Sequence, residues 1–147
     1  MPKKSLGQNF LIDKNIINKI IKIGDINEDK TILEIGAGYG DLTQAISLMG
    51  PKKILAVEKD KKLSLFLKKK FEDCKNIKII NLDILNIIVK NNLENNIIVF
   101  GNLPYNISTK ILASLILLKK WPPWYDNLIL MFQKEVADRI IAKTKTK

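Results

Sequence analysis

The stretch "TILEIGAGYG", Thr31–Gly40, indicates the fold of this 147-residue chain more strongly than any other. Its almost wholly apolar first half predicts a short buried strand over Thr31–Ile35, and a helix is predicted from about Asp41 to Met49. Between them glycine occupies alternate positions, Gly36, Gly38 and Gly40, where positive φ angles and close approach of the backbone to a ligand are needed. A strand, a glycine-rich loop and a helix in this order predict a nucleoside site in an α/β sheet.

Strands and helices alternate along the rest of the chain. Asp13 is a suitable N-cap for the first helix, and Gly24 a suitable stop. Alternation of this kind predicts βαβ units, hence one domain over 1–147 with a parallel sheet and helices on both faces. The predicted strands are 31–35, 53–58, 77–83, 96–101 and 127–133, and the predicted helices are 15–24, 41–49, 61–71, 109–120 and 134–143.

Composition indicates a globular domain of the reducing cytoplasm. The 46% hydrophobic content is enough for one core. Apolar runs such as Ile111–Leu118 are far shorter than the ~20 residues that span a bilayer, so no membrane association is expected. The start "MPKKSLGQNFL" has no long apolar region, so no signal peptide is expected. Cys74 is the only cysteine and cannot form an internal disulfide.

The net charge of +10 favours a polyanionic partner such as nucleic acid. Codon drift in an AT-rich genome is the alternative, because Arg139 is the only arginine among 25 basic residues. Charge alone does not decide between the two. The lysines considered as phosphate contacts are Lys3, Lys4, Lys119 and Lys120.

Two acidic residues end the strands that follow the glycine loop. Glu58 lies about 20 residues after Gly38, where an acid can accept both hydroxyls of a ribose. Asp83 ends the next strand at the same sheet edge and is a candidate acceptor for an adenine amine. Its alternative role is the N-cap of a helix that starts in "LDILN".

The charge of the loop distinguishes between nucleoside ligands. No Lys-Ser/Thr pair follows the glycines, which argues against a Walker-type phosphate site. The negative charge of Glu34, just before Gly36, opposes a pyrophosphate and suits a cationic ligand. S-adenosylmethionine, which carries an ammonium and a sulfonium, therefore fits better than NAD.

The segment "FGNLPY", Phe100–Tyr105, predicts methyl transfer to a nucleobase amine. Such an amine is a poor nucleophile unless two acceptors hold its N–H groups. The Asn102 side-chain oxygen and a backbone carbonyl of Leu103 or Pro104 can do this, and Tyr105 can stack on a flipped base. A strand-ending turn is the alternative. The chain contains no histidine, which weakens any histidine-ligated metal site, and no metal is expected.

These motifs together resemble the KsgA-type small-subunit ribosomal RNA adenine dimethyltransferases, a family related to the erythromycin-resistance methyltransferases and the mitochondrial transcription factor B proteins. The resemblance implies a Rossmann-like class I S-adenosylmethionine-dependent methyltransferase fold. It also implies dimethylation of the N6 amines of two adjacent adenosines near the 3′ end of 16S rRNA. The segments that carry it are "SLGQNFL" (5–11), "EIGAGYG" (34–40), "VEKD" (57–60), "NLDIL" (81–85), "FGNLPYNIST" (100–109) and "FQKEVADRI" (132–140).

The resemblance also implies roles for individual residues. Asn9 and Leu11 would close over the cofactor, and Gly36 would contact its methionine end. Glu58 would bind the ribose and Asp83 the adenine amine. Asn102 would lie at the methyl-transfer region. The implied partner is small-subunit rRNA or a pre-30S particle, met by a monomeric protein.

Members of the family continue beyond the counterpart of Lys147, with two more strands and a small helical domain. We therefore expect a C-terminally truncated domain in which the fifth strand, 128–132, is an open apolar edge prone to pairing or aggregation. Two other functions stay open: a non-catalytic RNA-binding or ribosome-assembly remnant, and the related large-subunit rRNA adenine methyltransferase. Methyltransferases of DNA or protein-glutamine amines rank lower, because they usually carry proline where Leu103 stands.

Overall fold

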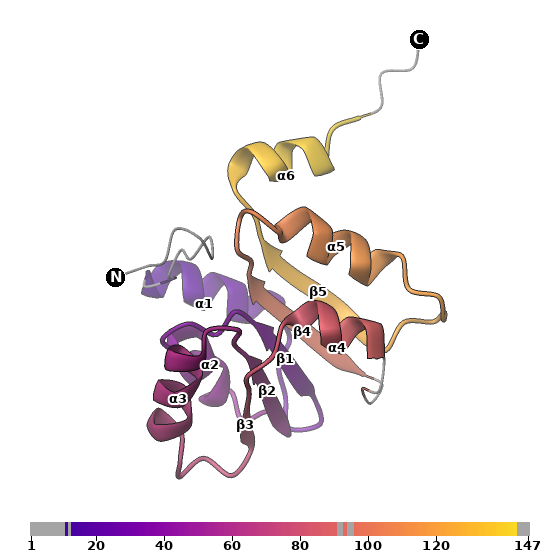
Figure 1. The fold of residues 1–147 in the computed structure, drawn as a ribbon. Coiled ribbons are helices and arrows are strands. Elements are labelled where there is room, and N and C mark those ends of the chain that lie inside the picture. Colours follow the sequence, from indigo (N-terminus) through magenta and orange to yellow (C-terminus); the bar gives the residue numbers. More distant parts are fainter. Residues whose placement is uncertain (1–10, 12, 91–92, 94–95, 144–147) are drawn as a thin grey trace.

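A computed structural model describes residues 11, 13–90, 93 and 96–143. Its centre is a five-stranded sheet in the order β3-β2-β1-β4-β5, in which all neighbouring strands are parallel (Figure 1). The crossover from β3 past β1 to β4 makes β1 the central strand. The strands are β1 (Thr31–Ile35), β2 (Lys53–Val57), β3 (Ile77–Ile80), β4 (Ile97–Asn102) and β5 (Tyr125–Met131).

Helices cover both faces of the sheet, as predicted. One core lies between one face of the sheet and the helices α1, α2 and α3, and a second core lies between the other face and the helices α4 and α5 (Figure 1). α6 follows β5 and has no buried residue. The helices are α1 (Lys14–Ile23), α2 (Asp41–Ser47), α3 (Lys61–Lys70), α4 (Ile84–Lys90), α5 (Ser108–Ile116) and α6 (Lys134–Ile140).

The central strand shows why its sequence is apolar throughout. All five residues of β1 are buried, because helices cover both sides. Ile32 packs into the first core, while Leu33 and Ile35 pack into the second. The side chain of Glu34 shares the face of Ile32, so a carboxyl group lies inside the first core.

The predicted strands and helices are all present: β1 has the predicted bounds, and the others differ at one or both ends. β4 includes Asn102, so the prediction that this strand ends before Asn102 is wrong by one residue. The helix predicted over 109–120 ends at Ile116. Asp13 caps α1 as predicted and accepts hydrogen bonds from the N–H groups of Asn15 and Ile16.

One helix, α4, was expected only as the alternative in which Asp83 caps a helix that starts in "LDILN". Its sequence "ILNIIVK" is rich in β-branched residues, which have low intrinsic helix propensity. The helix is stabilised by tertiary packing instead, because Ile84 and Ile88 are buried in the second core. Among the described residues, no helix is long and apolar enough to cross a membrane.

The fifth strand differs from the other strands of its half of the sheet. β5 is an edge strand, since only β4 pairs with it among the described elements. Its residues are half-buried or exposed, whereas those of β4 are buried up to Gly101. The expected open edge is therefore present in this part of the chain, and its tendency to aggregate stays a prediction.

Candidate functional site

A pocket lies at the carboxyl ends of β1, β2 and β4 and at the start of α4. This is the edge at which open parallel sheets bind ligands. Two predicted site residues do not line this pocket. The Leu103 side chain is buried in the second core, with 7% of its surface exposed, and Tyr105 is 44% exposed. Asn9 lies outside the described residues. The predicted site residues that line the pocket are Leu11, Gly36, Gly38, Glu58, Asp83, Asn102 and Pro104.

The glycine loop needs glycine for two separate reasons. At Gly36, φ is +74°, and an added Cβ would lie 3.2 Å from the Asn102 carbonyl oxygen. At Gly40, φ is +82°, and an added Cβ would lie 2.7 Å from the Phe71 ring. The Gly36 N–H donates to the Val57 carbonyl at 2.9 Å. The loop is therefore tied to β2 and lies against the end of β4.

Glu58 holds the glycine loop through a hydrogen bond to its side chain. Its side chain is buried, and Oε2 accepts a hydrogen bond from the Gly38 N–H at 3.0 Å. Oε1 accepts one from the Asp60 N–H at 2.8 Å. A carboxylate offers about four acceptor positions, so both oxygens retain capacity for ribose hydroxyls. Glu58 thus has a structural contact in addition to its predicted role with the ribose.

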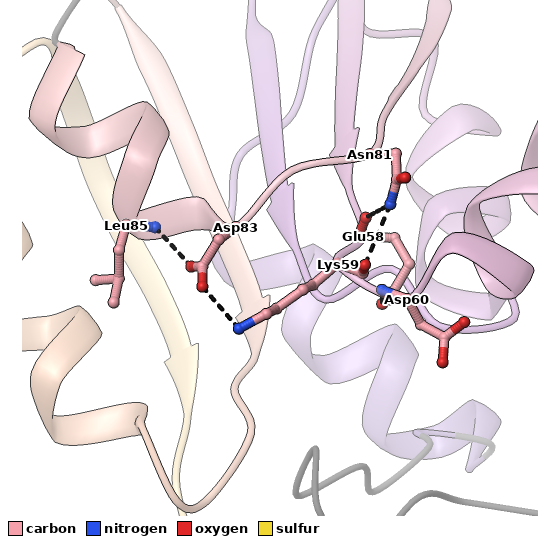
Figure 2. A network of polar contacts seen from close by, with 6 residues as sticks. All are labelled: Glu58, Lys59, Asp60, Asn81, Asp83 and Leu85. Carbon is pink, nitrogen blue, oxygen red and sulfur yellow. Dashed lines mark hydrogen bonds and ion pairs between the residues drawn. The ribbon is translucent and has the colours of Figure 1, made fainter.

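Asp83 makes two contacts at the mouth of α4 (Figure 2). Oδ1 accepts from the Leu85 N–H at 3.0 Å, which confirms the helix-capping interpretation. Oδ2 accepts from the Lys59 ammonium at 2.8 Å. This hydrogen bond with Lys59 is the main reason why the pKa of Asp83 lies below its ordinary value. The carboxylate is therefore ionised and acts only as an acceptor.

Asn81 joins the ends of β2 and β3. Its Nδ2 donates to the Glu58 carbonyl at 2.8 Å and to the Lys59 carbonyl at 3.2 Å (Figure 2). The two segments that carry Glu58 and Asp83 are held together by this amide. The two acids consequently line one pocket.

The charge state of Glu34 differs from the one that the sequence predicts. Its carboxyl is buried and accepts a hydrogen bond from the Thr43 hydroxyl. Burial is the main cause that raises the pKa of Glu34 to about 8, opposed by the Thr43 hydrogen bond. At pH 7 the group is mostly protonated. The prediction that a negative Glu34 selects a cationic ligand is therefore wrong for the free protein.

The turn after β4 is fixed by packing and by one backbone hydrogen bond. Leu103 is anchored in the second core. The Pro104 carbonyl accepts from the Ile107 N–H at 3.1 Å, which closes the turn into α5. Pro104 lines the pocket while Tyr105 lies largely in solvent. The predicted alternative, a strand-ending turn, is thus present, and it also borders the pocket.

The polar groups of the pocket fit S-adenosylmethionine better than a nucleotide with a pyrophosphate. The carboxylates of Asp41, Glu58 and Asp83 line it. Among the described residues, Lys59 is the one lysine that lines the pocket, and its ammonium is paired with Asp83. The negative charges of a pyrophosphate would be repelled by these carboxylates, with no unpaired cation in the described part of the pocket wall to neutralise them. The ribose hydroxyls, the adenine amine and the positive groups of S-adenosylmethionine would instead find acceptors.

Sequence reasoning gave no site role to several polar residues of the pocket, among them Asp41, Lys59 and Asn106. Lys59 lies inside the quoted segment "VEKD", directly after Glu58, but received no role. Its position next to a strand-ending acid is the signal that could have identified it. Asn106 follows the Tyr105 turn and shows no comparable signal.

Together, the sheet order and this pocket define a Rossmann-like methyltransferase. Solved structures agree. A dimethyladenosine transferase from Plasmodium falciparum is 29% identical, with a TM-score of 0.77, over 92% of this chain and 47% of that chain. The 23S rRNA methyltransferase ErmE is 26% identical, with a TM-score of 0.74, over 88% of this chain and 50% of that chain.

The chain belongs to the ribosomal RNA adenine dimethylase family, whose model matches residues 2–147. A protein of Pelagibacter ubique (strain HTCC1062) named ribosomal RNA small subunit methyltransferase A is 54% identical over 96% of this chain and 53% of its own length. The protein of the same name from Nitrobacter winogradskyi is 39% identical over 96% of this chain and 50% of its own. The chain thus spans about half the length of these curated relatives.

Proposed function

We propose that this chain forms the cofactor-binding part of an enzyme that transfers methyl groups from S-adenosylmethionine to adenosine N6 amines of small-subunit rRNA. Two adjacent adenosines near the 3′ end of 16S rRNA are the proposed targets. The observation that carries the proposal is the convergence of the glycine loop, Glu58, Asp83 and Asn102 on one pocket. The names of the relatives support the rRNA substrate.

Each wall of the pocket has a proposed part in holding the cofactor. Glu58 accepts the ribose hydroxyls, and Asp83 accepts the adenine amine. The backbone around Gly36 and Gly38 meets the methionine end. Leu11, which lines the pocket and is half-buried, covers the cofactor together with Asn9.

The bound cofactor supplies an electrophilic methyl group, and the chain supplies orientation. The Asn102 side-chain oxygen and the Leu103 carbonyl accept the two N–H groups of the target amine, which directs its lone pair outward. The Pro104 carbonyl already accepts from Ile107, which favours Leu103 as the second acceptor. The exposed Tyr105 ring stacks on the base. The acceptors also stabilise the positive charge that develops on nitrogen.

The partner and the setting follow from the same proposal. A net charge of +10 favours phosphate contacts, for which the exposed Lys119 and Lys120 are candidates. We propose that the protein works as a monomer in the cytoplasm, on small-subunit rRNA or a pre-30S particle.

Calorimetric titration of the chain with S-adenosylmethionine is the first test. We expect saturable binding with one site. Absence of binding in a folded sample would overturn the cofactor assignment. Binding without methyl transfer to small-subunit rRNA would favour the non-catalytic RNA-binding alternative for this chain.

Large-subunit rRNA is the second candidate substrate. The structural likeness to a 23S rRNA methyltransferase at 26% identity favours it, but the 54% identical relative carries a small-subunit name. Parallel assays with both RNAs separate the two. We expect methylation of small-subunit rRNA only, and labelled large-subunit rRNA would reverse the assignment.

A further inference from the structure

Lys59 occupies an unusual position at the pocket. Its backbone follows the end of β2, while its ammonium pairs at 2.8 Å with Oδ2 of Asp83, which lies between β3 and the start of α4 (Figure 2). The side chain thus bridges the segment after β2, which carries the proposed ribose acceptor, and the segment after β3, which carries the proposed adenine acceptor. Both Lys59 and Asp83 line the pocket.

The two contacts of Asp83 fix the orientation of its carboxylate. The Leu85 N–H holds Oδ1 at 3.0 Å, and Lys59 holds Oδ2. With one donor on each oxygen, rotation of the carboxylate about its Cβ–Cγ bond breaks at least one hydrogen bond. Each oxygen still has a lone pair available for a ligand.

The backbone of Lys59 is anchored as well. The Lys59 carbonyl accepts from Asn81 Nδ2 at 3.2 Å, and Asp60 accepts from the Lys62 N–H at 2.8 Å to begin α3. The lysine side chain therefore starts from an anchored backbone. Its 57% exposed side chain is held only by the Asp83 contact among the described residues.

We propose that Lys59 is a positioning residue that holds Asp83 in the orientation in which it recognises the exocyclic amine of the cofactor's adenine. This inference rests on the proposed function and deepens it. An ionised carboxylate is an acceptor only, so it favours a 6-amino purine over a 6-oxo purine. Lys59 fixes the direction of this carboxylate. Lys110 on α5 also contributes positive potential at Asp83, while Glu58 lines the same pocket with a carboxylate.

The test compares two ligands that differ at this one group. Affinities of the full chain for S-adenosylhomocysteine and S-inosylhomocysteine, which has a carbonyl in place of the amine, are measured by calorimetry. We expect the wild type to prefer the amine. Lys59→Met retains the stem and removes the ammonium, and we expect it to lower this preference by about threefold, the effect of a partly exposed ion pair.

Three single variants and one double variant serve as controls. Lys59→Arg restores a cation and should restore the preference. Lys61→Met removes an exposed lysine that does not line the pocket, and should leave the preference unchanged. Asp83→Asn should lower the preference itself, and adding Lys59→Met to it should have no further effect.

Each other outcome contradicts the inference in a different way. An equal loss of affinity for both ligands in Lys59→Met would show a merely structural role. Tighter binding of S-adenosylhomocysteine would show that Lys59 obstructs the acceptor. A wild type that binds both ligands equally would refute the Asp83 assignment but leave the proposed function intact. A folded wild type that binds neither ligand would refute the proposed function together with the inference.

Discussion

Two loops face each other at the carboxyl edge of the sheet, and they are stabilised differently. The glycine loop after β1 is held by its own backbone, with hydrogen bonds to the Val57 carbonyl and the Glu58 carboxylate and positive φ at three glycines. The turn after β4 is held by a buried side chain, Leu103, and by the short turn that Pro104 begins. It leaves Tyr105 in solvent.

The difference indicates a division of labour between folding and chemistry. A side chain added at Gly40 collides with the core residues Phe71 and Leu67, so the end of this loop is part of the packed fold. We expect the polar side chains of the β4 turn to be removable without opening the core, because Asn102 is only half-buried and Tyr105 is exposed. We therefore expect changes in the first loop to affect stability and cofactor affinity, and changes in the second to affect methyl transfer.

Gly40→Ala is expected to have the largest effect on this comparison. A new Cβ would combine a left-handed φ with overlap against Phe71 and Leu67, which destabilises the fold by about 4 kcal/mol. Denaturant unfolding measures the change. Gly50→Ala is the matched control, since Gly50 has φ of +69° but no atom within 4 Å of an added Cβ. Equal losses in both variants would show that packing under the loop is unimportant.

The pH dependence of stability tests the buried acid beneath the same loop. Because the folded-state pKa of Glu34, about 8, exceeds its unfolded value, the folded protein binds this proton more tightly. The contribution of Glu34 to stability is complete at acid pH and declines as the pH rises toward 8. We expect a loss of about 3 kcal/mol between pH 5 and pH 8.

Glu34→Gln mimics the protonated acid and should remove this decline. Unfolding free energies of both proteins at several pH values give the comparison. Parallel pH profiles for the two proteins would mean that Glu34 is ionised in the folded state.

Asn102→Ala tests the opposite loop. We expect methyl transfer to slow by about a hundredfold while cofactor affinity and unfolding free energy stay near wild type. The assay uses small-subunit rRNA and, if the chain alone does not turn over, the chain extended by the C-terminal half of the 54% identical relative. Asn106→Ala removes another amide from the pocket wall and should be nearly neutral. An unchanged rate in Asn102→Ala would remove its proposed role.

Glu58→Ala should produce the smallest of these effects, about a tenfold loss of cofactor affinity through the ribose hydroxyls. Calorimetry measures the affinity, and thermal unfolding measures the loss of the Gly38 contact separately. Unchanged affinity would refute the ribose assignment. Lost stability with unchanged affinity would mean that Glu58 only braces the loop.

The sequence alone determined the positions of the strands and most helices along the chain, because apolar runs and the residues that interrupt them are local properties of the sequence. It also indicated the glycine loop and the two acids at this edge, since the carboxyl ends of parallel strands meet there, although β3 ends at Ile80 and Asp83 lies beyond the strand. It indicated α4 only through the alternative role of Asp83 as an N-cap, because the β-branched residues of this helix have low helix propensity and become helical by packing against the second core.

Tertiary structure alone decided the chemical state and the partners of the site residues. Glu34 is mostly protonated because the surrounding core removes water from it, and burial of this kind cannot be seen in "TILEI". Asp83 is paired with Lys59, and Asn81 joins the segments that carry Glu58 and Asp83. Charge and hydrogen bonding depend on distances in space between residues far apart in the chain, and only the packed fold sets those distances.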